Sequence, residues 1–156
     1  MSAAREKTAT PCIAIIHGPN LNLLGTREPE LYGTMTLAAL DEHLRAKGRG
    51  FGVDVLSFQS NHEGALIDFI HDMAGRAAGF VINAGGFTHT SVALRDALLG
   101  TRVPFVEAHV TNIHAREAFR RRSLLADVAV GVVTGLGTAS YELALEGLVR
   151  HLERKR

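Results

Sequence analysis

Four side chains in this sequence have the types and spacing that acid–base chemistry needs. Tyr32 follows Arg27 by five residues, and His109 follows Glu107 by two. A tyrosine acts as a base only when nearby cations lower its pKa from about 10. A carboxylate beside an imidazole can orient the ring and keep it protonated, which suits a general acid. The two pairs indicate a base and an acid. An ordinary loop tyrosine beside a solvated arginine, and a structural Glu–His hydrogen bond, are the alternatives.

A glycine turn near the middle of the chain is the second feature that points to a ligand. Asn83 and His89 flank Gly85 and Gly86, which lack the side chains that would keep a ligand away from the backbone. The hydroxyls of residues 88, 90 and 91 can cap the helix that follows. In open parallel sheets, turns at the carboxyl ends of strands are where ligands bind. This turn therefore predicts part of a binding site.

Other motifs give weaker indications. Eight histidines suggest zinc, but no His-x-x-x-His pair falls on a strong helix, and His109 and His114 are divided between a strand end and a loop, so we expect no metal site. The Gly135-x-Gly137 pair lacks the third glycine of a dinucleotide fingerprint and follows the last strand, so a helix cap is its expected role. Four arginines form either a solvated face or a site for substrate oxygens: Arg116, Arg120, Arg121 and Arg122.

Alternating strand and helix patterns would position these groups. Short apolar segments predict strands over residues 13–16, 53–59, 80–82, 103–109 and 128–133. Helical stripes are predicted over residues 37–48, 66–77, 92–99 and 141–152. Ser60 and Glu63 have the spacing of a capping box for the second helix. This alternation favours an α/β fold, a flavodoxin-like doubly wound five-stranded parallel sheet of order 2-1-3-4-5. In that order the loops after residues 16 and 82 meet.

Two longer segments have no clear period and are predicted to be site loops. Residues 21–33 contain both Arg27 and Tyr32, and their charges need solvent or a ligand. Residues 111–123 are polar and arginine-rich, with only a short helical possibility at 115–119. Because Glu107 and His109 immediately precede the second segment, we expect both loops to border the same site.

Composition limits the possible partners. A chain of 156 residues suits one compact core, so we expect a flexible N-terminal segment over residues 1–11 and a single catalytic domain over 12–156. The net charge of +1 gives no general attraction to nucleic acid or anionic lipid. Residues 1–10 lack the apolar run of a signal peptide or membrane span, and the single Cys12 fits a reducing compartment. We therefore expect a cytoplasmic protein with no nucleic-acid or membrane partner.

Taken together, four long motifs resemble the type II 3-dehydroquinate dehydratases of the shikimate pathway. The motifs are GPNLNLLGTREPELYG (residues 18–33), FQSNHEGALID (58–68), INAGGFTHTSVALRDAL (82–98) and EAHVTNIHAREAFR (107–120). The likeness covers nearly everything from residue 13 to 152. It implies a lyase that converts 3-dehydroquinate to 3-dehydroshikimate by anti elimination through an enolate. It also implies no metal or organic cofactor, and a dodecamer built as a tetramer of trimers.

The resemblance assigns roles to individual residues. Tyr32 would accept the proton, His109 would donate one, and Arg27 would stabilise the charged tyrosine and the transition state. Asn20 would hold the water that faces the enolate, and Glu107 would orient His109. The substrate would be bound by Asn83, His89 and Arg120 at its hydroxyls, by the backbone N–H groups of Val110 and Thr111 at its carboxylate, and by Asp96 near a subunit contact.

The sequence departs from the commonest family pattern in a few places. Thr111 stands where serine is usual, and residues 121–124 and 138–140 also differ, which bears on affinity more than on reaction type. One rival from another class is a non-catalytic flavodoxin-like module that binds a nucleotide or flavin in the same crevice. Bound flavin would colour the purified protein yellow, whereas a dehydratase would produce an ultraviolet-absorbing enone. An inactive oligomeric scaffold is the third possibility, and retention of Tyr32 and His109 argues against it.

Overall fold

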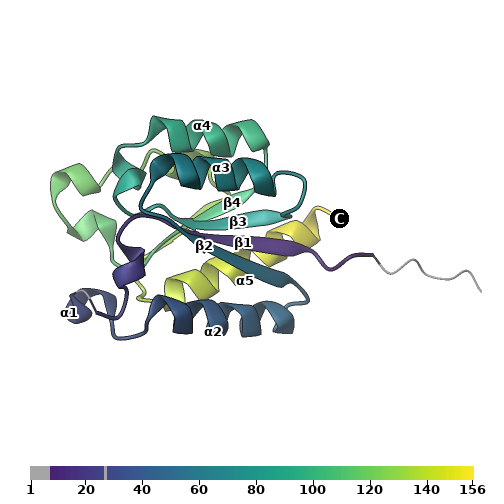
Figure 1. The fold of residues 1–156 in the computed structure, drawn as a ribbon, viewed down its shortest axis with the longest axis horizontal. Helices are drawn as coiled ribbons and strands as arrows, with labels where there is room; N and C mark the ends of the chain where they lie inside the picture. The colour runs from purple at the N-terminus through teal and green to yellow at the C-terminus, as the bar shows by residue number, and fades with distance from the viewer. Residues whose placement is uncertain (1–7, 27) are drawn as a thin grey trace, which may run out of the picture.

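Five parallel strands form one sheet in the order β2-β1-β3-β4-β5, which confirms the predicted topology (Figure 1). The strands are β1 Cys12–His17, β2 Asp54–Gln59, β3 Gly79–Asn83, β4 Phe105–His109 and β5 Gly131–Thr134. The computed structural model describes residues 8–26 and 28–156, without the side chains of residues 31 and 32. Most of the predicted N-terminal segment, residues 1–7, therefore lies outside the described residues.

The helices cover the sheet on both faces, α3 and α4 on one and α2 and α5 on the other (Figure 1). Their bounds are α1 Pro29–Tyr32, α2 Leu37–Gly50, α3 Glu63–Met73, α4 Val92–Thr101 and α5 Ala139–Arg154. Short 3₁₀ turns lie between them: η1 Leu21–Leu23, η2 Gly85–His89, η3 Ile113–Ala115, η4 Ala118–Arg120 and η5 Ala126–Val128. In the described part of the chain, no helix has the length and apolar character needed to cross a membrane.

The pleat of β1 divides the core into two halves. Ile13 and Ile15 pack in the cluster that contains the apolar faces of α2 and α5, while Ala14 and Ile16 pack in the cluster of α3 and α4. All four side chains are fully buried, because a central strand of a doubly wound sheet is covered on both faces. By the same alternation, the last residue of the strand, His17, falls on the α2 and α5 side.

The same alternation determines which face each functional side chain occupies. Val81 belongs to the core cluster of α2 and α5, so Asn83, two residues later, lies on that face of β3. On β4, Ala108 belongs to that cluster as well. Glu107 and His109 must then lie on the opposite face, toward α3 and α4. The end of the sheet therefore presents polar groups on both of its faces.

Side-chain caps begin two of the helices. Thr36 Oγ1 accepts a hydrogen bond from the backbone N–H of Ala39 at 3.2 Å, at the start of α2. Ser91 Oγ accepts from the N–H of Leu94 at 2.9 Å, at the start of α4, so one of the three predicted hydroxyls is the cap.

The prediction for α3 was wrong at both ends. Its N-cap residue is His62, with no side-chain cap, and Ser60 Oγ accepts from the N–H of His62 at 3.0 Å instead of forming a capping box with Glu63. The helix ends at Met73, because Gly75 adopts a positive φ of 79° that a helix cannot contain. The apolar Ala77 thus belongs to the connection that leads to β3.

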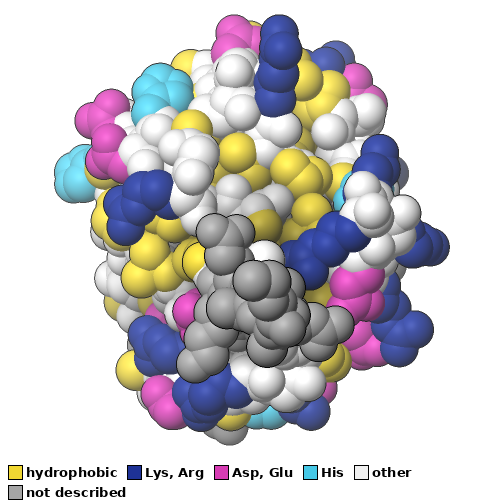
Figure 2. All heavy atoms as spheres, turned by 90° about the vertical axis from the view of Figure 1, so that its right-hand side faces the viewer, with side chains coloured by type: hydrophobic (Ala, Val, Ile, Leu, Met, Phe, Trp, Pro, Cys, Tyr) yellow, Lys and Arg dark blue, Asp and Glu magenta, His cyan; other side chains and the backbone are white. Residues whose placement is uncertain are grey.

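The remaining differences concern strand starts and loops. Residues 126–128 form the turn η5, so β5 begins later than residue 128. Pro104 precedes β4, and its carbonyl accepts from the N–H of Phe80 at 3.0 Å. The two predicted loops contain short turns that no hydrophobic period reveals, η1 and α1 in the first and η3 and η4 in the second. Figure 2 shows the end of the molecule at which the strands begin, seen from the right-hand side of Figure 1. Basic and acidic side chains are interspersed on this surface, as the small net charge suggests.

Candidate active site

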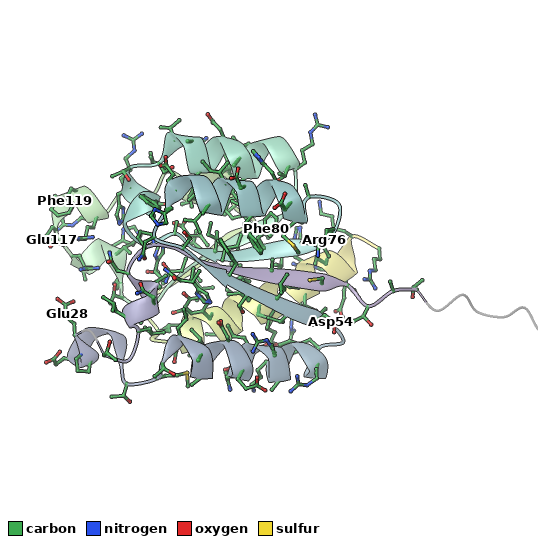
Figure 3. The ribbon with its side chains drawn as sticks, in the orientation of Figure 1. Glu28, Asp54, Arg76, Phe80, Glu117 and Phe119 are labelled. Carbon is green, nitrogen blue, oxygen red and sulfur yellow. The ribbon has the colours of Figure 1, made fainter. Side chains whose placement is uncertain are left out.

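A cavity of about 260 Å³ opens at the carboxyl ends of β1, β3 and β4. It is lined by residues at or after the ends of these strands: Pro19, Asn20, Leu21, Leu23 and Leu24 after β1; Asn83, Gly85, Gly86 and His89 at the end of and after β3; and His109, Val110, Thr111, Ile113, Arg116 and Arg120 at the end of and after β4. The predicted meeting of the loops after residues 16 and 82 is therefore confirmed. Figure 3 shows Glu117 and Phe119 at this end of the sheet and Asp54 and Arg76 at the other.

The turn after β1 is packed directly against the turn after β3. The N–H of Gly18 donates to the carbonyl of Asn83 at 2.7 Å. A Cβ atom at Gly18 would lie 2.3 Å from the carbonyl oxygen of Ala84, so only glycine fits here. Asn20 has a left-handed φ of 68°, and its N–H donates to Asn61 Oδ1 at 2.9 Å. This contact fixes the backbone that presents Asn20 to the cavity.

The predicted Glu107–His109 pair is present and buried. His109 Nε2 lies 2.9 Å from Glu107 Oε1, and the residues are 5% and 0% exposed. Ser123 Oγ donates to the same carboxylate oxygen at 2.6 Å. Glu107 Oε2 is buried without a hydrogen-bond partner among the described residues. Because Nε2 forms the hydrogen bond with Glu107, Nδ1 is the ring nitrogen of His109 that is left to form a hydrogen bond with a ligand in the cavity.

Ser123, which the sequence interpretation did not single out, connects this pair to the loop that follows. Its Oγ accepts from the backbone N–H groups of Leu125 and Ala126, both at 3.1 Å, while it donates to Glu107. No sequence period links Ser123 to Glu107, which precedes it by 16 residues.

Ser123→Ala should lower the free energy of unfolding by about 1–3 kcal/mol, since two backbone donors lose their partner and the buried Glu107 carboxylate loses one of its two. Urea denaturation measures this loss. Ser57→Ala is the matched control, because Ser57 Oγ is buried with no partner in the described part of the chain and its removal breaks no hydrogen bond. Equal effects of the two substitutions would show that the Ser123 hydrogen bonds do not stabilise the loop.

Basic side chains border the cavity on the side of η4. His89 Nδ1 donates to the carbonyl of Arg122 at 2.8 Å, which leaves Nε2 of His89 for a ligand. Arg120 Nε donates to Glu117 Oε2 at 2.9 Å, and the guanidinium lies 5.0 Å from the ring centroid of the exposed Phe119. The pKa of the Glu117 carboxyl is lowered, first by its own backbone N–H and then by Arg120 and Arg116.

Some predicted site residues are not brought together here. Arg27 lies outside the described residues, and Tyr32 ends α1 with a side chain that is also outside them. Asp96 is exposed on α4 and is not among the described residues that line the cavity. Their roles therefore stay predictions. Of the four arginines considered, only Arg116 and Arg120 are among the described lining residues.

A second cluster of buried polar side chains lies on the α2 and α5 side of the sheet, and the sequence interpretation missed it. His17 Nδ1 is 2.9 Å from the hydroxyl of Tyr141, and His17 Nε2 is 2.8 Å from Asp41 Oδ1. Burial raises the pKa of the Tyr141 phenol well above its usual value, and a hydrogen bond with the Asn83 side chain partly opposes the rise. Tyr141 therefore stays protonated at neutral pH. The only sequence signal was a histidine at the end of a buried strand.

Comparisons with known proteins point to a single family. The family model described as Dehydroquinase class II matches residues 11–149. A 3-dehydroquinate dehydratase of Parasynechococcus marenigrum is 56% identical over 142 residues, which are 91% of this chain and 97% of that protein. Catabolic 3-dehydroquinase 2 of Neosartorya fischeri is 54% identical over 142 residues, 91% of this chain and 95% of that protein.

A solved structure gives the same result. The type II dehydroquinase of Propionibacterium acnes superposes with a TM-score of 0.85 at 40% identity, covering 89% of this chain and 96% of that one. The family model, which matches residues 11–149, spans the five strands and all the described residues that line the cavity. The chain thus belongs to the class II dehydroquinase family.

Proposed function

We propose that this chain removes water from 3-dehydroquinate to give 3-dehydroshikimate. The observation that carries the proposal is the buried His109–Glu107 pair at the cavity, in a chain of the class II dehydroquinase family. The substrate is a β-hydroxy ketone. Removal of the proton beside its carbonyl gives an enolate, and departure of the β-hydroxyl as water then needs an acid. His109, with Glu107 opposite its Nε2, supplies that acid through Nδ1.

Tyr32 is the proposed base, and the state of the other tyrosine supports this assignment. The chain has two tyrosines, and Tyr141 keeps its proton because burial raises its pKa. A phenolate base at neutral pH requires a cation nearby, and Arg27 is the proposed source of that charge. Base and acid act on opposite faces of the substrate, which gives anti elimination.

The polar lining supplies the binding groups. Asn83, His89 and Arg120 are proposed to hold substrate hydroxyls, and Asn20 to hold a water that faces the enolate oxygen. The carbonyls of Val110 and Thr111 accept hydrogen bonds at 3.0 Å from Gly137 N and Thr134 Oγ1, respectively. These bonds fix the segment whose N–H groups would bind the substrate carboxylate. Fixed dipoles of this kind need no reorganisation when charge develops.

The direct test is to add 3-dehydroquinate to the purified protein and follow the ultraviolet absorbance of the conjugated enone. A rise that depends on enzyme concentration supports the proposal, and its absence would refute it. The alternative, a non-catalytic module for a nucleotide or flavin, is not favoured by the dehydratase names of the relatives. That alternative predicts visible absorbance from bound flavin and no enone.

Turnover should survive exhaustive dialysis against EDTA, because the proposed acid and base are both side chains. Among the described residues, no group of three or more His, Cys, Asp or Glu side chains lies close enough to hold a metal ion. The enone assay before and after dialysis measures the effect. Activity that disappears with EDTA and returns with a divalent cation would contradict this mechanism.

We further propose that the protein is cytoplasmic and acts as a homo-oligomer, a dodecamer built from trimers, in which Asp96 approaches a neighbouring subunit's cavity. The exposure of Asp96 on α4 supports this role. Light scattering should then give a mass that is a multiple of the 16.8 kDa chain.

Asp96→Ala should raise the Michaelis constant for 3-dehydroquinate by about 10-fold, a loss of roughly 1.4 kcal/mol in binding. A fully active monomer would refute the subunit contribution.

A further inference from the structure

A buried chain of hydrogen bonds leads from helix α2 to the floor of the cavity. Asp41 Oδ1 lies 2.8 Å from His17 Nε2, and His17 Nδ1 lies 2.9 Å from the Tyr141 hydroxyl. Asn83 acts on the same hydroxyl, since a hydrogen bond from its side chain opposes the rise in the pKa of Tyr141. His17 and Tyr141 are 0% exposed, and only Asn83 of these four is among the described residues that line the cavity.

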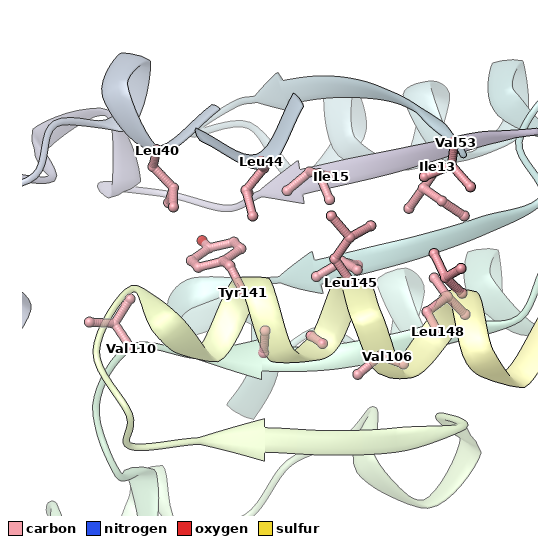
Figure 4. Close-up of a cluster of buried hydrophobic side chains, with 14 of the residues drawn as sticks. Ile13, Ile15, Leu40, Leu44, Val53, Val106, Val110, Tyr141, Leu145 and Leu148 are labelled. Carbon is pink, nitrogen blue, oxygen red and sulfur yellow. The ribbon is translucent and has the colours of Figure 1, made fainter. Parts of the chain in front are cut away.

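The strands and helices hold the members of this chain from several directions. His17 and Asn83 are register partners at the ends of β1 and β3. Figure 4 shows the Tyr141 ring projecting from α5 toward Leu40 and Leu44 of α2. The aromatic ring is thus part of the apolar core, while its hydroxyl meets the polar ends of the two strands.

The hydrogen-bond partners determine the direction in which each proton points. The N–H of Gly85 donates to Asn83 Oδ1 at 3.1 Å, so the Asn83 amide turns its NH₂ group toward Tyr141. An NH₂ group only donates, so the Tyr141 oxygen accepts and its own proton goes to His17 Nδ1. The neutral imidazole then carries its proton on Nε2, which donates to Asp41. Each contact in this arrangement joins a donor to an acceptor, whereas a flipped Asn83 amide would place its NH₂ group against the N–H of Gly85.

An amide NH₂ group has two hydrogens, and Tyr141 uses one of them. The second is the group that Asn83 can offer to the cavity. We propose that Tyr141, His17 and Asp41 are positioning residues that hold the Asn83 amide so that this second N–H meets a substrate hydroxyl. The inference rests on the proposed function, in which Asn83 binds a hydroxyl of 3-dehydroquinate.

Buried polar networks also rigidify a core, so the test must separate positioning from plain stabilisation. A double-mutant cycle does so, since residues that act through one another are not additive. Tyr141→Phe keeps the ring and removes only the hydroxyl. Alone it should lower kcat/KM for 3-dehydroquinate by about 10- to 100-fold, because small misplacements of a binding group are costly. In an Asn83→Ala background it should change kcat/KM by less than about twofold.

His17→Gln provides a second variant that removes the imidazole, and it should be non-additive with Asn83→Ala in the same way. His43→Gln is the matched control. His43 also pairs with a carboxylate, since its Nε2 lies 2.8 Å from Glu142 Oε2 between α2 and α5. In the described part of the chain, this pair has no hydrogen bond to Asn83. This control should leave kcat/KM unchanged. If His43→Gln reduces kcat/KM as much as His17→Gln does, the network only stabilises the packing of α2 on α5.

A readout without substrate completes the experiment. With ¹⁵N-asparagine labelling, the Asn83 side-chain NH₂ resonances are those that Asn83→Ala removes. Tyr141→Phe, or His17→Gln if the first variant does not fold, should shift these resonances and speed their exchange with solvent. Multiplicative effects on kcat/KM, or unchanged Asn83 resonances, would overturn the inference. A wild-type protein that does not convert 3-dehydroquinate would refute the proposed function instead, and the Asn83 resonances would still decide whether the network orients the amide.

Discussion

Replacing His109 by alanine should lower kcat for 3-dehydroquinate by about 10²–10⁴-fold, the usual contribution of a positioned proton-transfer group. The proposed acid acts mainly when the hydroxyl departs, so the Michaelis constant should change much less. Steady-state kinetics with the enone assay separate the two parameters. The melting temperature must be measured in parallel, because His109→Ala leaves the fully buried Glu107 carboxylate with Ser123 as its one hydrogen-bond partner among the described residues.

Two further variants sharpen this result. Glu107→Gln preserves size but replaces the carboxylate that holds the His109 ring at 2.9 Å, so it should lower kcat by a smaller factor than His109→Ala. His114→Ala is the control, since His114 is an exposed histidine in the neighbouring turn η3 and is not among the described lining residues. A near-normal kcat with a raised Michaelis constant in His109→Ala would reassign His109 to substrate binding.

The parts of this site that could be predicted are those that depend on local geometry alone. Glu107 and His109 were expected on one face because a strand repeats every two residues, and their side chains meet at 2.9 Å. Asn83 and His89 were expected at a rim because they flank a glycine turn that follows a buried strand. The sheet order followed from the alternation of strands and helices, for which few topologies are available.

The parts that could not be predicted depend on which elements pack together. His17 meets Tyr141 across 124 positions of sequence and Asp41 across 24, and no period relates them. The alternation in β1 does place His17 on one face of the sheet. It does not say that α5 brings a hydroxyl to that point. The overlong prediction for α3 has a similar origin, since Ala77 continued the apolar stripe although the chain turns at Gly75.

The second large effect concerns Tyr32, the proposed base, which would act as a phenolate near neutral pH although an unperturbed phenol has a pKa of about 10. Tyr32→Phe should lower kcat by about 10²–10⁴-fold at every pH, because the ring stays and the base is gone. Arg27→Gln should behave differently. It keeps the base but removes a charge that favours the phenolate, so the pKa of Tyr32 should rise. The two variants therefore separate the loss of the base from the loss of its activation.

The sign of the shift in Arg27→Gln follows from the state that the base needs. Proton abstraction requires the deprotonated phenol, so activity falls as pH drops below the pKa of Tyr32. If that pKa rises, the acid limb of the kcat–pH profile moves to higher pH, and the variant should recover part of its turnover in alkali. Arg102→Gln is a control, because Arg102 is an exposed arginine in the turn after α4. An Arg27→Gln profile with an unmoved acid limb, lower by one factor at all pH values, would mean that Arg27 acts on the transition state and does not tune Tyr32.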